Sequence, residues 1–417
     1  MAASVAKPVL NEDWTSVVLG ALVIGLALAG LHLPKPEFNW SDGGSLSEKV
    51  FTASNLLQIG GLFLILLVIA VIGNLFARKP LRPYLISFPL VFIVSVLAMF
   101  LAGNKTIKDL NLEAVIFSLS LGLIIGNFFT LPDWLRASLS TELFVKIGLV
   151  LLGTSIIFGD MLKAGSLGLL QALVVVLSVW YFAFWVCKKL GVEDDMRMMI
   201  SSAVSICGVS AAIATAGAIS GDTKKLSYVI SLVLVTAIPM MIGMPYLAQW
   251  MELPEAVTGA WLGGSIDTSG AVVAAGTLVG EEALKVSTIV KFSQNVLLGL
   301  AAFAISVYWT YTRKEGLAVE KPTLGVIWER FPKFVIGFVA ASLLFSFVLD
   351  SETIARVKNP LKNIQTMFFV LAFTSIGLET KFSDLFSQKN RKPLYGFLIA
   401  QGFNIVITLI VAYLLFR

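Results

Sequence analysis

Long apolar runs separated by short polar stretches dominate the pattern of this chain. About 20 residues of helix cross the hydrocarbon core of a bilayer, and each run is near that length. The pattern predicts an all-α polytopic membrane protein with about 11–13 transmembrane segments, some of which can be broken or re-entrant. The thirteen runs lie at roughly 16–33, 52–77, 84–103, 114–130, 143–159, 164–187, 196–219, 227–248, 256–279, 286–312, 332–350, 363–378 and 394–416.

Composition supports this class and excludes others. Hydrophobic residues make up 57% of the 417 residues and charged residues only 14%, whereas a soluble chain carries about 25% charged residues. Soluble enzymes, disordered chains, coiled coils and disulfide scaffolds are therefore excluded. The net charge of +5 comes from Lys and Arg in short loops, where they set membrane orientation, so nucleic acid is not an expected partner.

No set of residues points to catalysis or to a bound metal. The single His and the two Cys do not combine with carboxylates at metal-ligand spacing. Neither a nucleophile–base pair nor a P-loop is visible. The sequence therefore predicts a protein that is not an enzyme and that uses no metal and no cofactor, apart from a proton or a sodium ion as a coupling ion.

Lys and Arg counts in alternate loops predict the orientation. If all thirteen runs cross, the loops on the N-terminal side hold 17 of these residues and the opposite loops hold 11. Because cytoplasmic loops carry the excess of positive charge, the N-terminus is expected in the cytoplasm.

The stretch 201–217 is unusually small and polar for the middle of an apolar run. Gly208 permits backbone angles that an ordinary helix avoids, and Ser205 and Ser210 can bond the backbone groups that a break sets free. Such a break would direct the N-terminus of a half-helix, with its free N–H groups, at the middle of the bilayer, where an anion can bind. The alternative is close helix packing through small residues.

The stretch 263–276 echoes the first one, with Ser265-Ile266 matching Ser205-Ile206. Asp267 lies inside this run, and a charge at such depth costs ~3 kcal/mol or more, so it indicates a functional site. It could bind a coupling cation, exchange a proton or pair with a lysine. If both stretches cross fully, they run parallel, which simple inverted symmetry does not produce.

Lys291 is a second deep charge. Lys291, Gln294 and Asn295 have the i, i+3, i+4 spacing of one helix face, which can line a polar cavity. Lys291 can pair with Asp267, receive an anion or extend to the interface. For Lys146, Glu142 is the expected partner.

A short internal repeat is also present. Val150-Leu-Leu-Gly-Thr-Ser-Ile156 matches Val370-Leu-Ala-Phe-Thr-Ser-Ile376 at five of seven positions. The two copies are expected to run in opposite directions, as in inverted-repeat transporters, although chance recurrence of common membrane residues is the alternative.

Two long blocks carry a resemblance to a known family. The stretch Ser205-Ile-Cys-Gly-Val-Ser-Ala-Ala-Ile-Ala-Thr-Ala216 resembles the signature of the YeiH-like sulfate exporter family. The second block of that family is similar, in order and spacing, to Trp261-Leu-Gly-Gly-Ser-Ile266, Val272-Val-Ala-Ala-Gly276, Glu282-Ala283 and Thr288-Ile-Val-Lys291, and further landmarks resemble Ile147–Gly153 and Gly377–Thr380.

The resemblance extends from about residue 115 to 417, and residues 1–110 are expected to be scaffold helices of the same single domain. One departure is clear. After Ser265-Ile266 the family has a His-Glu-Val-Ala-Gln-like run, whereas this chain has Asp267-Thr-Ser-Gly-Ala271. The element expected to touch the ligand or coupling ion has changed, so substrate or coupling can differ from the family's.

The family resembles the larger grouping of cation/proton antiporters and bile-acid symporters. That resemblance implies a panel domain, a core domain with discontinuous crossing helices, and a homodimer that works by an elevator-like motion.

Together these observations predict a secondary transporter of a small anion, sulfate or an organosulfonate, in a bacterial inner membrane. The expected substrate-binding residues are Ser205, Cys207, Gly208, Ser210, Ser265, Thr268 and Ser269, and the expected coupling or gating residues are Asp267, Lys291, Gln294 and Asn295. A cation/proton antiporter that uses Asp267 and an anion channel are the alternatives.

Overall fold

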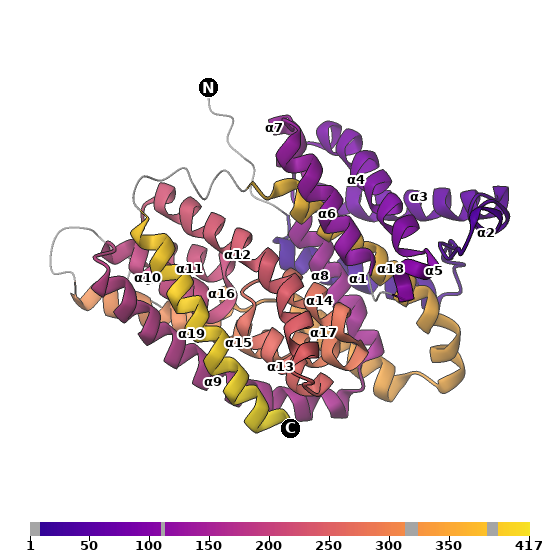
Figure 1. Cartoon of the computed structure of the whole chain (residues 1–417). Helices are drawn as coiled ribbons and strands as arrows, with labels where there is room; N and C mark the ends of the chain where they lie inside the picture. Colours follow the sequence, from indigo (N-terminus) through magenta and orange to yellow (C-terminus); the bar gives the residue numbers. More distant parts are fainter. Residues whose placement is uncertain (1–8, 110–112, 313–323, 382–390) are drawn as a thin grey trace. The chain divides into compact units, whose positions relative to one another are not determined.

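The computed structural model describes residues 9–109, 113–312, 324–381 and 391–417, and every regular element in these ranges is a helix (Figure 1). Seven of the described helices are long and apolar enough to cross a membrane. They are α3 (Ala53–Phe76), α4 (Leu81–Ala102), α9 (Phe158–Lys189), α12 (Thr223–Trp250), α15 (Glu281–Thr312), α18 (Ser351–Glu379) and α19 (Lys392–Phe416). The prediction of an all-α polytopic membrane protein is confirmed.

The other predicted runs form shorter or interrupted helices. Four are α1 (Glu12–Leu28), α6 (Ala114–Phe128), α8 (Thr141–Leu152) and α17 (Phe334–Leu343). The run 196–219 forms α10 (Asp194–Ser202), a π-helical turn (Ala203–Cys207) and α11 (Val209–Ile219), and the run 256–279 forms α13 (Glu255–Ser265) and α14 (Ser269–Val279). Short helices in the connections are α2 (Gly43–Ser45), α5 (Lys105–Asp109), α7 (Asp133–Ser138) and α16 (Gly325–Arg330). Lys7, Arg313, Lys314, Lys321 and Lys389, which contribute to the charge count, lie outside the described residues.

Aspartate side chains cap the first turn of two of the long helices. The Asp222 carboxylate accepts a hydrogen bond from the Lys224 backbone N–H (2.7 Å) at the start of α12, and Asp350 accepts one from the Thr353 N–H (2.8 Å) at the start of α18. These N–H donors hold the pKa of Asp222 and that of Asp350 below the usual range. Each of these two helices is thus preceded by a charged group that satisfies free N–H groups at the helix start.

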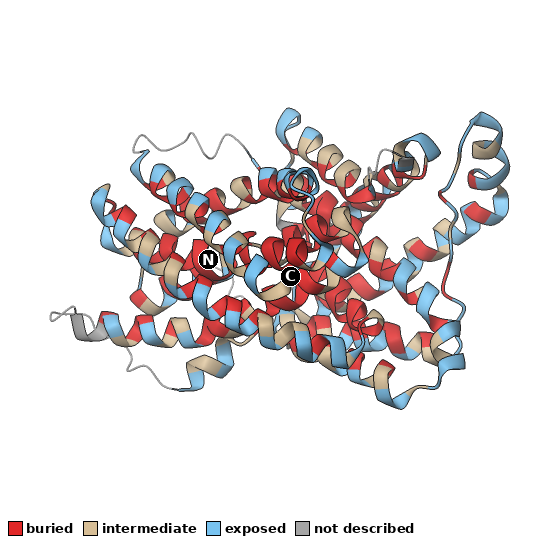
Figure 2. Cartoon of the chain, turned by 60° about the horizontal axis from the view of Figure 1, so that its bottom comes forward, coloured by how far each residue is buried: buried red, intermediate tan, exposed pale blue. Residues whose placement is uncertain are grey.

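Many large apolar side chains on the long helices are exposed. Leu57 on α3, Ile93 on α4, Leu177 on α9 and Leu414 on α19 are examples. Figure 2 shows exposed positions in pale blue along the same helices that carry buried positions in red. Such apolar surface is costly in water and favourable against lipid chains, so it agrees with membrane embedding.

The chain forms two compact units. Unit 1 comprises residues 1–158 and 333–380, and unit 2 comprises residues 159–332 and 381–417. The expected scaffold segment 1–110 therefore lies within unit 1, whereas the region that resembles the exporter family is divided between both units. Both interrupted helices belong to unit 2.

In unit 1, α8 and α18 pack against each other in opposite directions. Phe144 near the start of α8 and Ser375 near the end of α18 line one small cavity, whereas Gly148, one turn later, lies against Phe369, further back along α18. The copies 150–156 and 370–376 begin in these two helices, so their directions are opposite, as expected. Whether they mark a true inverted repeat stays a prediction.

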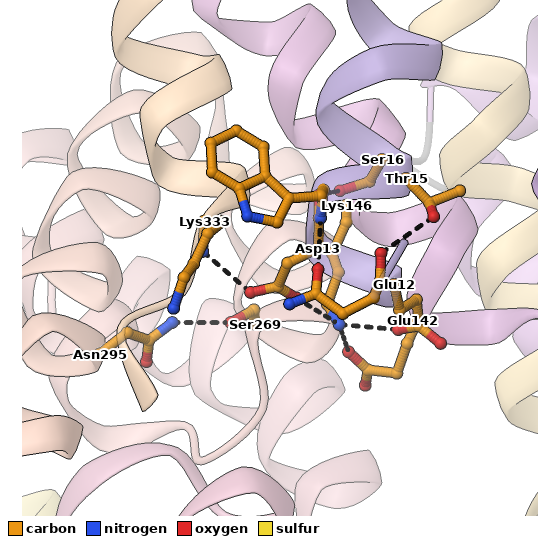
Figure 3. A network of polar contacts seen from close by, with 11 residues as sticks. Glu12, Asp13, Thr15, Ser16, Glu142, Lys146, Ser269, Asn295 and Lys333 are labelled. Carbon is orange, nitrogen blue, oxygen red and sulfur yellow. Dashed lines mark hydrogen bonds and ion pairs between the residues drawn. The ribbon is translucent and has the colours of Figure 1, made fainter. Parts of the chain in front are cut away.

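An ionic cluster joins α1 to α8 in unit 1 (Figure 3). The Lys146 ammonium lies 2.7 Å from a Glu12 carboxylate oxygen, 3.0 Å from one of Asp13 and 3.7 Å from one of Glu142. Glu142, the partner expected from sequence, is thus the most distant of the three. Asp13 also accepts a hydrogen bond from the Lys333 backbone N–H (2.9 Å), which places the start of α17 beside α1.

We expect Lys146→Met to lower the free energy of unfolding by about 2 kcal/mol, because three carboxylates would then face one another without a cation. Thermal unfolding of the purified protein in detergent measures this loss. Lys35→Met removes an exposed lysine from the same unit and should leave Tm unchanged within about one degree. Equal Tm values for the two variants would contradict the stabilising role of the cluster.

Candidate functional site

The helices α10 and α11 form a hairpin, here called the first hairpin (residues 194–219). Lys225, at the start of α12, forms ion pairs with two carboxylates at the start of α10. Glu193 directly precedes α10, and Asp195, at 2.8 Å, lies in its first turn. Lys225 follows the end of α11 after a short turn, so the two ends of the hairpin are adjacent. Met199 of α10 and Ile219 of α11 also share one buried apolar cluster.

The helices α13 and α14 form the second hairpin (residues 255–279). A methyl group built on Gly280, directly after α14, would lie 2.7 Å from the carboxylate of Glu255, the first residue of α13. Gly263 of α13 and Gly276 of α14 both pack against Ser287 of α15. The second hairpin therefore also returns to the end at which it started.

The two hairpins point toward each other from opposite ends of α12. Three residues separate the first hairpin from the start of this helix, and four residues separate its end from the second hairpin. Because both hairpins double back, neither run crosses, and eleven of the thirteen predicted runs remain as candidate crossings. If both runs had crossed the membrane, they would have run parallel, which does not fit an inverted repeat. Two hairpins that enter from opposite ends of α12 avoid this conflict.

The tips of the hairpins touch at Gly208 and Asp267. Gly208 has φ +61° and ψ −112°, a conformation that residues with a side chain rarely adopt. A methyl group on Gly208 would lie 2.6 Å from Val233 of α12 and 3.1 Å from the Asp267 Cβ. The interruption expected at Gly208 is therefore present, and the backbone there closely approaches the second hairpin.

Two half-helices begin at these tips. α11 starts at Val209, directly after Gly208, and α14 starts at Ser269, two residues after Asp267. The first N–H groups of a helix have no acceptor within it, and they carry the positive end of the helix dipole. The Thr268 hydroxyl accepts the Ala271 N–H (3.3 Å) and satisfies one of these donors in α14. Asp267 thus lies where the positive ends of two 11-residue helices converge.

Three uninterrupted helices donate hydrogen bonds to backbone carbonyls of the hairpins, and the donors on α15 and α19 satisfy carbonyls that the breaks set free. The donors are Gln171 on α9, Lys291 and Gln294 on α15, and Gln401 and Asn404 on α19. Their acceptors are Ala260 O for Gln171 (2.8 Å), Ile206 O for Lys291 (3.0 Å), Gly264 O for Gln294 (3.0 Å), Ser265 O for Gln401 (2.8 Å), and both Val204 O (3.1 Å) and Ser265 O (3.2 Å) for Asn404. A broken helix in an apolar interior needs such partners, since an unpaired carbonyl there costs about 1–3 kcal/mol.

The structure brings most of the predicted site residues together. Ser205, Cys207 and Gly208 lie in the first tip and Ser265 and Asp267 in the second, all buried. Thr268 and Ser269 are half-buried, and Ser210 is exposed. The Ser205 hydroxyl donates to Ser201 O (2.7 Å), one helical turn back along the first hairpin.

The predicted face of α15 is buried at the tips as well. Lys291 is only 1% exposed, so it does not extend to the interface. Its ammonium donates to Ile206 O and to the Gln294 Oε1 (3.0 Å), and among the described residues no ion pair within 4.0 Å joins it to Asp267. Asn295 donates to the Ser269 hydroxyl (3.3 Å; Figure 3).

Several buried oxygens near the tips have no donor within the described part of the chain. They include Asp267 Oδ2, Ser265 Oγ, Asn295 Oδ1 and Gln401 Oε1. Asp267 is 2% exposed, and an unpaired buried carboxylate oxygen is uncommon. Across the described ranges, no group of three or more His, Cys, Asp or Glu side chains converges to hold a metal ion. The unsatisfied oxygens therefore mark the tips as a place where a proton or ligand can bind.

Sequence reasoning missed the amides Gln171, Gln401 and Asn404. Each is an uncharged polar residue inside an apolar run, and Gln401, Asn404 and Thr408 have the spacing of one helix face. Polar side chains in membrane helices commonly bond across to neighbouring segments. The same rule applied to α9 and α19 would have identified these residues as partners of the hairpins.

Comparisons with known proteins agree with the membrane assignment. The family model described as conserved hypothetical protein 698 matches residues 86–396. A UPF0324 membrane protein of Rhodopirellula baltica is 40% identical over 86% of this chain, and one of Nitratidesulfovibrio vulgaris is 38% identical over 83%. This chain covers 67% and 62% of the lengths of these two relatives. A UPF0324 membrane protein of Nitrosomonas europaea is 28% identical over 93% of this chain and 92% of its own length.

No solved structure matches this chain. The family model covers well over half of the 417 residues, and the names of these relatives state membrane location only. The chain belongs to the conserved hypothetical protein 698 family, among the UPF0324 membrane proteins.

Proposed function

We propose that this protein is a secondary transporter of a small anion, sulfate or an organosulfonate, bound between the tips of the two hairpins. The observation that carries the proposal is the contact between Gly208 and Asp267, because it brings the N-termini of α11 and α14 to one place. Paired half-helices with N-termini directed at an anion are a recurring transporter device. The resemblance to YeiH-like sulfate exporters points to the same substrate class.

Substrate contacts in this proposal come from backbone N–H groups and hydroxyls at the tips. Ser210, Thr268 and Ser269 are the predicted residues that are not fully buried, so they are the first contacts available to an entering anion. Ser205 and Ser265 are fully buried and would support the tips instead. These closed tips favour a transporter with alternating access over a channel, which needs a continuous polar path.

Alternating access is proposed to occur by an elevator-like movement of unit 2, because this unit contains both hairpins and all five side chains that bond backbone carbonyls of the hairpins. In a proposed homodimer, the scaffold segments (residues 1–110) of two copies would join and stay in place while unit 2 moves. Coupling to a proton or a sodium ion would supply the driving force.

The hairpins also strengthen the proposed orientation. If the other eleven runs cross and neither hairpin does, Lys224 and Lys225 move to the N-terminal side of the membrane. That side then holds 19 Lys and Arg against 9 on the other. We therefore propose an inner-membrane protein with a cytoplasmic N-terminus.

A cation/proton antiporter is a second candidate. The unsatisfied oxygens of Asp267, Ser265 and Asn295 favour it, since oxygens without donors can coordinate a cation. Sodium flux that depends on pH and needs no anion would support this candidate over the anion transporter.

We expect Val209→Pro to weaken sulfate binding about tenfold or more. Proline at the first position of a helix keeps the helix but removes one N–H, and a hydrogen bond to an ion is worth about 1.5–3 kcal/mol. Calorimetric titration of the purified protein with sulfate, sulfite, a sulfonate and acetate, each with and without sodium, measures binding and selectivity.

Ala53→Pro is the control, because Ala53 is the first residue of α3 in unit 1. It should bind sulfate like the wild-type protein. Wild-type affinity in Val209→Pro would exclude the N-terminus of α11 from the binding site, and binding of no oxyanion at all would contradict the proposed function.

A further inference from the structure

Asp267 occupies the place at which a substrate anion is expected. Its backbone and Cβ lie against Gly208, the residue that precedes α11, and it comes just before Thr268, which caps α14. The positive ends of both half-helices therefore already have a carboxylate beside them. A second anion at this place would face a negative charge within a few ångströms.

The surroundings of Asp267 in unit 2 do not neutralise it by a direct bond. Asp267 Oδ2 is buried and has no donor among the described residues. Of the elements packed on the tips, α15 presents the Lys291 ammonium and the first hairpin presents the Cys207 thiol. The nearby side chains on α9, α12 and α19 are Gln171, Val233, Gln401 and Asn404, none of which carries a charge.

Lys291 is held away from the carboxylate by its own hydrogen bonds. Its ammonium donates to Ile206 O and to Gln294 Oε1, both at 3.0 Å. A buried carboxylate without a bonded partner is strained in its ionised form, and a proton relieves that strain. Protonation also changes the group from an acceptor into a carboxylic acid with one O–H donor.

We propose that Asp267 acts as a resident anion that must take up one proton before a substrate anion can bind, so that anion and proton move together. This inference rests on the proposed function and names the proton as the coupling ion. In the ionised state the carboxylate fills the positive site. After it accepts a proton, the free N–H groups of α11 and α14 and the new O–H group face the substrate. When the substrate leaves, the proton leaves as well and the site is filled again.

Sulfate is the appropriate probe, because its own charge stays constant between about pH 5 and 9. We expect the Kd of the full-length wild-type protein for sulfate to rise about tenfold per pH unit above the pH at which Asp267 ionises. Asp267→Asn, which keeps the shape and removes the charge, should bind sulfate with a Kd that does not change with pH. Asp160→Asn, an exposed carboxylate at the start of α9, is the matched control and should keep the wild-type pH dependence.

A second measurement needs no variant. Calorimetric titration of the wild-type protein in two buffers with different ionisation enthalpies, at a pH in the range where the Kd rises tenfold per pH unit, should show uptake of one proton for each sulfate bound. A wild-type Kd that does not vary with pH, or binding without proton uptake, overturns the inference and leaves an anion transporter without this coupling. Loss of sulfate binding in folded Asp267→Asn overturns it as well, whereas binding of no oxyanion by either protein at any pH overturns the proposed function itself.

Discussion

Gly208→Ala is expected to lower the free energy of unfolding by about 2–5 kcal/mol and to abolish anion binding. The positive φ of Gly208 costs a residue with a side chain about 1–3 kcal/mol, and overpacking adds a similar amount. The added methyl group would lie 2.6 Å from Val233 and 3.1 Å from the Asp267 Cβ, so the tips would have to separate. Thermal unfolding in detergent and sulfate titration measure the two effects.

Gly243→Ala is the matched control for this prediction. Gly243 lies in α12 of the same unit, and no atom lies within 4 Å of the position of an added methyl group. Alanine there should be neutral or stabilise the helix by up to about 1 kcal/mol. If Gly208→Ala were as stable as Gly243→Ala, the close approach of the tips would be wrong.

Asn404→Leu is expected to cost about 1–3 kcal/mol and to weaken anion binding. Asn404 donates to Val204 O of the first hairpin and to Ser265 O of the second, so its loss removes a bond to each tip. Leucine has a similar size and donates nothing, and a buried carbonyl without a donor carries most of this cost. The hydroxyl of Thr408 loses its acceptor as well.

Gln401→Met on the same helix provides the comparison. It removes one donor from Ser265 O, which keeps the hydrogen bond from Asn404. We expect a loss of less than about 1 kcal/mol in the same unfolding measurement. A larger effect of Gln401→Met than of Asn404→Leu would show that bridging the two tips contributes little.

The sequence predicts the helices and the places where they break. Apolar runs near 20 residues locate the membrane helices, and the small residues around Gly208 and Asp267 mark both interruptions, because few other residue types permit a break in an apolar interior. Close helix packing, the alternative for the stretch 201–217, occurs in the second hairpin, where Gly259 and Gly263 pack on α15. The two explanations are therefore complementary at this site.

The path of the chain after each break could not be predicted. A half-helix that continues forward and one that turns back have the same composition, and the difference lies in long-range contacts such as those of Lys225 with Asp195 and of Gly280 with Glu255. Pairing of Lys291 with Asp267, one of the three alternatives for this lysine, could not be judged from the sequence for the same reason. The free carbonyl of Ile206 bonds the ammonium, and no sequence pattern indicates that carbonyl in advance.

The amides of Gln294 and Asn404 link the tips of the two hairpins, and this link restricts how the tips can move. Gln294 donates to Gly264 O and, at 3.5 Å, to Ser205 O, while Asn404 on a different helix donates to Val204 O and Ser265 O. Each amide thus forms hydrogen bonds to the tips of both hairpins, and the two amides come from separate helices, α15 and α19. If one hairpin tip moved away from the other, the hydrogen bonds of both Gln294 and Asn404 to that tip would break. Opening of the site therefore requires the two hairpins, α15 and α19 to move together as one rigid body.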